Sequence, residues 1–179
     1  MSLRSLKKAT IFRFRMLSDE NDNFVRDFEM EESSTLLQMH EFIIDMLKYD
    51  QCMASFYTAD ERWEREQEYT YMDMGMGMGD GGSGTPKPME EAVLADILHH
   101  LHDRLIYIFD PFTQRAYYIE LIEAKEPQKG MAYPRLQFAH AATPDQYDPE
   151  ASEDSGSIFD EIMGEFNDFD GDDNYDDEY

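Results

Sequence analysis

Residues 105–109 read LIYIF and residues 116–122 read AYYIELI, with the polar segment DPFTQR between them at 110–115. Both runs are rich in the β-branched and aromatic side chains that favour extended strands. The polar segment supplies the reversal of the chain. This stretch therefore predicts an antiparallel hairpin, and it is the clearest structural signal in the chain.

A second hairpin is predicted near the beginning of the chain. Residues 11–17 and 24–30 both alternate between apolar and polar types, and the segment 18–23 between them is a polar turn. Such alternation is typical of strands with one buried face. On the first of these strands the apolar side is formed by Phe12, Phe14 and Met16.

Two helices and several shorter strands are expected in the remaining regular segments. Apolar residues recur at helical spacing from residue 36 to about Tyr49, and Ser33, Ser34 or Thr35 can cap this helix. Shorter strands are expected at 53–57, near the end of 61–72 and at 133–138. A second helix is predicted over residues 90–103 from the stripe Val93, Leu94, Ile97, Leu98 and Leu101.

These elements predict an α+β fold with two β-hairpins and two helices in one mixed-sheet domain. The order hairpin, helix, strand at the beginning resembles the opening of a β-grasp fold. Residues 72–88, MDMGMGMGDGGSGTPKP, interrupt the pattern, because Gly is costly to order and Pro lacks a backbone donor. Regular patterns flank this Met/Gly segment, so we expect a flexible loop inside the domain.

Charge divides the chain at residue 144. The 179 residues include 40 acidic and 15 basic side chains, a net charge of −25. Residues 145–179 hold 15 acidic residues and no Lys or Arg, whereas residues 1–144 hold 25 acidic and 15 basic ones. Uncompensated charge resists collapse, so we expect one domain at 1–144 and a mostly disordered acidic tail at 145–179.

Composition also restricts the location and the class of protein. No stretch approaches the ~20 apolar residues of a membrane span, and the N-terminal segment MSLRSLKKATIFRFR lacks the apolar core of a secretory signal. The single cysteine, Cys52, excludes an internal disulfide and fits a reducing, cytoplasmic location. The acidic balance makes the whole chain a poor nucleic-acid binder, because phosphates are repelled.

Residue patterns for catalysis, cofactors and metals are weak. Cys52 has no local signature of a base and an orienting acid, and the glycine-rich segment carries Asp80, which would repel phosphate. His99, His100 and His102 lack the i,i+4 spacing of helical zinc ligands and are expected on the protein surface. The sequence therefore predicts no catalytic set, no cofactor and no metal.

Part of the acidic tail has a pattern beyond its charge. Ser157 precedes IFDEIMGEFNDF at 158–169, and Ser157 with Asp160 resembles a capping box. A short helix over these residues would either dock in a groove of a partner protein or pack on its own domain. Its apolar stripe, the tail stripe, consists of Ile158, Phe159, Ile162, Met163, Phe166 and Phe169.

The beginning of the chain has the opposite charge. Residues 1–26 carry six basic and three acidic side chains, which could meet the acidic tail or remain a solvated end. Because exposed ion pairs are weak, two solvated ends are the simpler interpretation. This candidate basic face consists of Arg4, Lys7, Lys8, Arg13, Arg15 and Arg26.

The chain resembles the plasmid pRiA4b ORF-3-like family, also described as insertion-element passenger proteins. Single residues that match positions of the family pattern are Arg26, Met39, His40, Ile43, Tyr107 and Asp110. The resemblance covers roughly residues 9–140 and leaves the tail outside. It is carried by FVRDFEM (24–30), SSTLLQMHEFIIDMLKYD (33–50), MASFYTADERWEREQEYTYMDMG (53–75) and LIYIFDPFTQRAYYIELIEA (105–124).

The chain departs from the family pattern at several polar positions. Typical members continue after the aspartate with Phe-Gly-Asp-Asp-Trp-x-His, whereas residues 111–117 read PFTQRAY here. Met53 stands where the family has a histidine, and Tyr49 where it has a tryptophan. The resemblance therefore implies a fold more than a polar site, and its largely uncharacterised members imply little about function.

The leading functional prediction is a non-enzymatic protein-interaction domain whose acidic tail recruits or regulates an unknown protein partner. The alternative is a mobile-element-associated nucleic-acid-binding protein, in which the tail covers the basic face and inhibits binding. An enzyme that uses Asp110 or His40 is the third hypothesis. His40 falls on the apolar stripe of the first helix, where a packed histidine bonded to a neighbour is the expected state.

Overall fold

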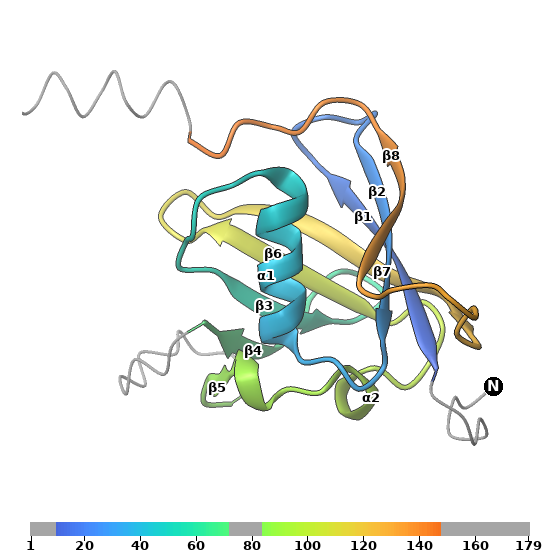
Figure 1. The fold of residues 1–179 in the computed structure, drawn as a ribbon. Helices are drawn as coiled ribbons and strands as arrows, with labels where there is room; N and C mark the ends of the chain where they lie inside the picture. The colour runs from blue at the N-terminus through green and yellow to red at the C-terminus, as the bar shows by residue number, and fades with distance from the viewer. Residues whose placement is uncertain (1–9, 72–83, 148–179) are drawn as a thin grey trace, which may run out of the picture. The chain divides into compact units, whose positions relative to one another are not determined.

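Eight strands and three helical segments make up the described part of the chain, residues 10–71 and 84–147 of this computed structural model (Figure 1). A first compact unit ends at Pro144 and a second begins at Asp145. The elements are β1 (Ile11–Ser18), β2 (Val25–Glu31), α1 (Leu36–Leu47), β3 (Ser55–Ala59), β4 (Arg65–Thr70), β5 (Lys87–Pro88), η2 (Met89–Glu91), α2 (Leu94–Ile97), β6 (Arg104–Asp110), β7 (Arg115–Lys125) and β8 (Arg135–His140).

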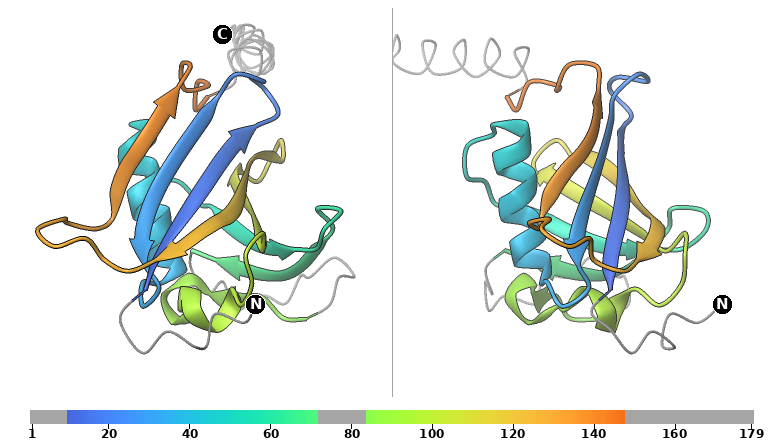
Figure 2. Two further views of the ribbon diagram at one scale, coloured as in Figure 1. Left: turned by 90° about the vertical axis from the view of Figure 1, so that its right-hand side faces the viewer. Right: turned by 45° about the vertical axis from the view of Figure 1, so that its right-hand side comes forward.

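All of these strands belong to one mixed sheet in the order β5-β4-β3-β6-β7-β1-β2-β8. Both predicted hairpins, β1–β2 and β6–β7, are present, and β7 pairs antiparallel with β1 to join them. Only the short contact between β4 and β5 is parallel among the described strands. Figure 2 shows β8 beside β2 at the end of the sheet. The predicted α+β fold, with its hairpin–helix–strand opening, is confirmed.

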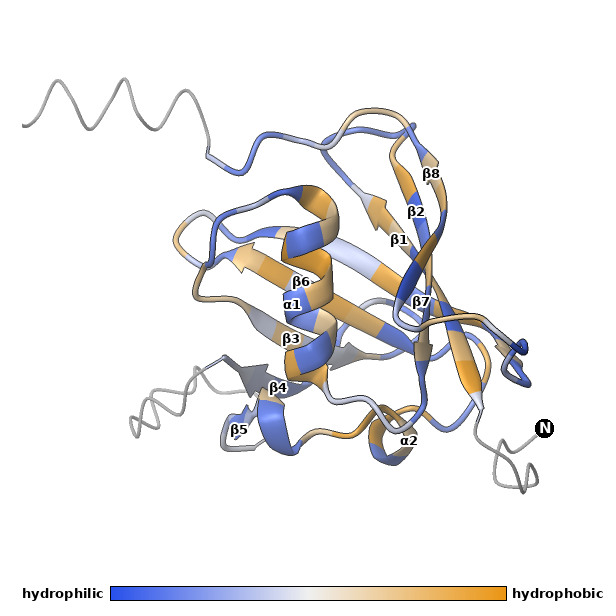
Figure 3. Cartoon of the chain, viewed as in Figure 1, coloured by the Kyte–Doolittle hydropathy of each residue, from blue (hydrophilic) through white to orange (hydrophobic). Residues whose placement is uncertain are grey.

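The main hydrophobic core lies between α1 and one face of the sheet (Figures 1 and 3). Phe28 of β2 stacks on Phe14 of β1 with ring centroids 5.4 Å apart, and it contacts Phe42 of α1 at 5.5 Å. The apolar side predicted for β1 is buried as expected. The residues of α1 that are buried in this core are Leu36, Met39, His40, Ile43 and Leu47.

A capping box at Thr35 fixes the beginning of α1. The Thr35 hydroxyl accepts a hydrogen bond from the Gln38 amide at 3.2 Å, and the Gln38 side chain accepts one from the Thr35 amide at 2.9 Å. Each bond satisfies a backbone N–H that the first turn of a helix leaves without a partner. The structure thus selects Thr35 from the three candidate caps.

Removing this cap is expected to weaken the domain measurably. Thr35→Ala should lower the free energy of unfolding by about 1 kcal/mol, because the Gln38 amide loses its acceptor. Urea denaturation of the full chain measures this loss. Thr35→Ser keeps a hydroxyl acceptor and should restore most of the stability, whereas equal losses in both variants would contradict a capping role.

The second helix is much shorter than the predicted span of residues 90–103. It comprises only Leu94–Ile97, directly after the short 3-10 helix η2 and two extended residues. Backbone bonds to the segment before α1 hold the residues around Val93 extended: Leu36 N–H donates to Ala92 and Leu94 N–H to Ser34, each at 2.8 Å. The helix length predicted from the apolar stripe is therefore wrong, because backbone pairing with the segment before α1 overrides the helical spacing of these residues.

The Met/Gly segment lies mostly outside the described residues, which omit 72–83. Its last two residues, Lys87 and Pro88, pair with β4, so the predicted loop ends before them. The remaining shorter strands occur within two residues of their predicted places. None of the described helices is long and apolar enough to cross a membrane.

Candidate functional site

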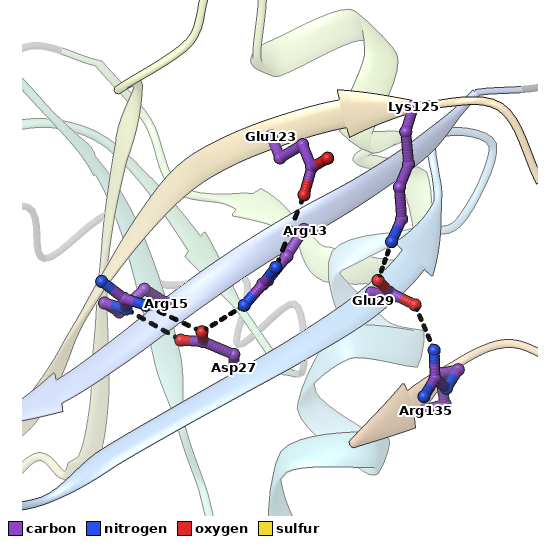
Figure 4. A network of polar contacts seen from close by, with 7 residues as sticks. All are labelled: Arg13, Arg15, Asp27, Glu29, Glu123, Lys125 and Arg135. Carbon is purple, nitrogen blue, oxygen red and sulfur yellow. Dashed lines mark hydrogen bonds and ion pairs between the residues drawn. The ribbon is translucent and has the colours of Figure 1, made fainter. Parts of the chain in front are cut away.

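Charged side chains gather on the outer face of the sheet, the face opposite α1. The β1–β2 register pairs Arg15 with Asp27 and Arg13 with Glu29, so these four alternate with the core residues of both strands. β7 and β8 flank this hairpin and add further charges. Figure 4 shows the resulting ion-pair cluster of Arg13, Arg15, Asp27, Glu29, Glu123, Lys125 and Arg135.

Asp27 is the centre of one half of the ion-pair cluster. Arg15 donates to both of its carboxylate oxygens at 2.9 Å, and Arg13 Nη2 donates to Oδ2 at 2.8 Å. The Asp27 side chain is 1 % exposed, whereas those of Arg13 and Arg15 are 23 % and 45 % exposed. Burial alone would raise the pKa of Asp27, but hydrogen bonds from Arg15 and Arg13 outweigh it and lower that pKa.

Glu29 is the centre of the other half. Its fully buried carboxylate contacts the Lys125 ammonium through Oε1 and accepts a hydrogen bond from Arg135 Nη1 through Oε2 at 2.8 Å. Lys125 lies at the end of β7 and Arg135 at the beginning of β8. This carboxylate therefore ties the two strands to β2.

Cations outnumber carboxylates in the ion-pair cluster. Each buried carboxylate has two cationic partners, and the third carboxylate, Glu123, is exposed and lies 3.5 Å from Arg13. The partly exposed Arg and Lys side chains cover the buried acids, as long amphipathic side chains do. The outer face therefore presents cationic groups to solvent beside β2 and β8.

The structure does not bring the described members of the candidate basic face together. Arg13 and Arg15 belong to the ion-pair cluster, whereas Arg26 pairs with Met16 in the register and so lies on the core side of the hairpin. Arg26 is only 7 % exposed and its guanidinium lies over the Phe24 ring. Arg4, Lys7 and Lys8 lie outside the described residues.

Arg26 instead holds the chain where it leaves the last strand. Its guanidinium donates to the carbonyl oxygens of His140 and Ala141 at 2.8 and 2.9 Å and to the Thr143 hydroxyl at 3.1 Å. The Tyr49 hydroxyl donates to the Pro144 carbonyl at 2.6 Å. These contacts form an exit clasp, made by Arg26 and Tyr49, that fixes residues 140–144 on the domain.

A buried polar cluster lies between α1 and β6. His40 is fully buried, with Nδ1 2.8 Å from the Tyr107 hydroxyl and Nε2 3.2 Å from the Gln51 amide nitrogen. An amide nitrogen only donates, so His40 Nε2 accepts and Nδ1 carries the proton that it donates to Tyr107. Burial lowers the pKa of His40 to about 4. The histidine is thus packed and bonded to neighbours, as predicted.

Two further residues considered for catalysis have structural contacts. The Cys52 thiol interacts with Tyr107, and burial raises the pKa of this thiol, which disfavours the nucleophilic thiolate. The Asp110 carboxylate accepts bonds from the Phe112 amide and the Thr113 amide and hydroxyl at 3.0, 3.3 and 2.7 Å. Asp110 therefore organises the β6–β7 turn, and Tyr107 completes the contacts of His40.

The remaining sequence candidates are either exposed or outside the described residues. His99, His100 and His102 are exposed, and His102 Nδ1 lies 3.3 Å from Glu120. Within residues 10–71 and 84–147 no group of three or more His, Cys, Asp or Glu side chains could hold a metal ion. All six residues of the tail stripe lie outside the described residues.

The sequence analysis predicted the last strand but not its exposure, and it missed the two buried carboxylates. A usable signal for the carboxylates was present, because RFR at 13–15 and DFE at 27–29 face each other in the predicted hairpin. Opposite charges across an antiparallel pair interact directly. The register would have assigned Arg13 and Arg15 to ion pairs rather than to a free basic face.

Comparison with known proteins identifies relatives of this fold. The family model for plasmid pRiA4b ORF-3-like proteins matches residues 10–173. The match extends into the acidic tail, so the expectation that the resemblance ends near residue 140 is wrong. A search among curated proteins returned no significant match.

A solved structure also shares the fold. It is the crystal structure of a protein of unknown function from Methanosarcina mazei Go1, with a TM-score of 0.64 and 17 % sequence identity. The alignment covers 97 % of this chain and 94 % of that one. At this identity the likeness concerns the fold alone.

Proposed function

The chain belongs to the plasmid pRiA4b ORF-3-like family, and from this premise we propose that it is a non-enzymatic protein-interaction domain whose acidic tail recruits or regulates a partner. The observation that carries the proposal is the exit clasp. Arg26 and Tyr49 attach residues 140–144 to the domain immediately before the acidic segment begins. A segment that starts from a fixed point can present its apolar side chains to a partner without loosening the sheet.

The buried polar cluster supports the non-enzymatic part of the proposal. His40 uses both ring nitrogens on Tyr107 and Gln51, and burial holds it neutral at physiological pH. General acid–base catalysis needs a group that reaches substrate and whose pKa lies near the working pH. His40 meets neither requirement, and Asp110 is engaged in its own turn.

The tail stripe gives a direct test of this function. Ile162→Asp combined with Phe166→Asp should remove a partner that the unchanged chain retains, because two charges would have to enter an apolar contact. We expect at least about a tenfold drop in recovery, which corresponds to ~1.4 kcal/mol of binding free energy. Affinity capture from nuclease-treated lysate, with mass spectrometry of the retained proteins, measures the loss.

A matched control adds the same charge outside the tail stripe. Asn167→Asp combined with Asn174→Asp should retain the partner as well as the unchanged chain does. Equal retention by the Ile162→Asp and Phe166→Asp variant would contradict recruitment by the tail stripe. Nucleic acid recovered from untreated lysate, with no protein partner, would favour the mobile-element alternative instead.

A further inference from the structure

We propose that β8 is a docking site for an acidic, extended segment of another protein, which adds to the sheet as a further strand beside β8. In this arrangement the backbone of the partner segment forms a ladder of hydrogen bonds with the open edge of β8. The acidic side chains of the segment contact the cationic side chains of the outer face. Strand addition to an open sheet edge is a recurrent mode of peptide recognition. The site is independent of the acidic tail, and it goes beyond the proposed function.

The topology leaves β8 with one described neighbour. β8 is the last strand in the sheet order and pairs only with β2 among the described strands, over Glu29 to Val25. The opposite edge is β5, which has two residues, one of them Pro88. A short strand with proline is a protected edge, whereas the six residues of β8 contain no proline.

The side chains of β8 are more exposed to solvent than those of the other long strands of this sheet. Leu136 and Phe138 are 43 % and 48 % exposed, whereas the facing strand β2 is almost entirely buried. The register shift opposite Asp27 and Phe28 limits a regular ladder to short runs on either side of Gln137. Side-chain contacts with Leu136 and Phe138 must therefore supply much of the affinity.

Charge selects the kind of segment that fits this edge. No acidic residue occurs between Pro127 and Pro144, a stretch that carries Lys129 and Arg135 within a chain of net charge −25. Of the ion-pair cluster, Arg135 lies on β8 itself and pairs with Glu29 of the adjoining strand β2, and Lys125 of β7 contacts the same carboxylate. At physiological ionic strength charges beyond ~8 Å are screened, so the local positive charge dominates over the net charge of the chain.

The same charges disfavour a second copy of this chain as the occupant. Antiparallel pairing of two β8 strands would bring the same positive segment against itself about a two-fold axis. An acidic segment of a different protein does not have this penalty at the edge.

A synthetic peptide probe tests the docking site. The probe is a fluorescein-labelled peptide of alternating glutamate and valine, titrated against the full chain by fluorescence anisotropy. We expect saturable binding that falls at least about tenfold when Leu136→Ser and Phe138→Ser are combined. Lys129→Glu should weaken binding about threefold or more, whereas Lys48→Glu, the same change at the exposed end of α1, should leave it unchanged.

Changes in the probe separate strand addition from simple charge attraction. Methylation of alternate backbone nitrogens should abolish binding, because it removes the donors of the ladder, and replacement of glutamate by lysine should abolish it too. Binding that survives methylation overturns the proposal. No anisotropy change up to ~1 mM peptide, about −4 kcal/mol of binding free energy, also overturns it.

Other occupants of the edge would give distinct results. Sedimentation of the full chain should show no dimer, and a dimer abolished by Leu136→Ser with Phe138→Ser would assign the edge to a second copy. The Ile162→Asp and Phe166→Asp variant should bind the probe as the unchanged chain does. Tighter binding by that variant would assign the edge to the chain's own tail and overturn the proposal, while loss of a tail partner alone leaves it intact.

Discussion

Replacing Asp27 by asparagine is expected to lower the free energy of unfolding at pH 7 by about 2–3 kcal/mol and the Tm by about 6–10 °C. The asparagine amide keeps the volume of the buried side chain. It carries no charge, however, so it cannot replace the charged hydrogen bonds that Asp27 accepts from Arg13 and Arg15. Both guanidiniums are partly exposed, so water compensates some of the loss. We therefore expect a cost at or below the lower end of the range for broken buried ion pairs.

The effect of Asp27→Asn should depend on pH in a defined direction. The folded-state pKa of Asp27 lies below its ordinary value, so the carboxylate contributes stability that is present above about pH 4 and lost as the pH falls through the folded pKa. The stability difference between the unchanged chain and the variant should therefore narrow below pH 4. Urea denaturation at pH 7, 5, 4 and 3 measures it.

A control for this prediction exists within the ion-pair cluster. Glu123 is exposed and lies 3.5 Å from Arg13, so Glu123→Gln should change stability by less than about 0.5 kcal/mol. A loss from Asp27→Asn as small as that from Glu123→Gln would show that burial does not strengthen the contacts of Asp27. The comparison requires that both variants show the same slope of unfolding free energy against urea concentration.

Local patterns predicted most of the fold because they agree with the tertiary arrangement. The alternation around Phe14 and the helical spacing around Ile43 both place apolar residues on the core side, where both are fully buried. The length of the second helix was overestimated because there the local pattern disagrees with the tertiary arrangement. The backbone around Val93 bonds to the segment preceding α1, and sequence spacing does not contain that long-range pairing.

The functional features depend on sheet order, which the sequence does not encode locally. Among the described strands β8 lies at the edge of the sheet, because β7 pairs with β1 and β2 has β8 as its second neighbour. Its exposed Leu136 and Phe138 look like ordinary strand residues until this order is known. In the sequence Arg26 likewise resembles the other basic residues near the beginning of the chain. Its hydrogen bonds to the carbonyl oxygens of residues 140 and 141 appear only in the structure.

His40 gives the second large expected effect, a loss of stability between pH 6.5 and pH 4. In the unfolded chain histidine titrates near its ordinary pKa of about 6.5, whereas burial lowers the folded-state pKa of His40 to about 4. Between these values the unfolded chain binds more protons, so the free energy of unfolding falls as the pH falls. A difference of that size corresponds to about 3 kcal/mol over the interval.

The substitution His40→Gln should remove this pH-dependent component while leaving a side chain that can bond to Tyr107. The variant will itself be less stable at pH 7, so the quantity that tests the prediction is the slope of unfolding free energy against pH. We expect a clearly flatter slope between pH 4 and 6.5 for His40→Gln, whereas His140→Gln, at an exposed position, should keep the slope of the unchanged chain. This window lies above the one expected for Asp27, so the two contributions separate on the pH axis. A variant slope equal to that of the unchanged chain would show that His40 titrates alike in the folded and unfolded states, and hence that burial does not hold it neutral.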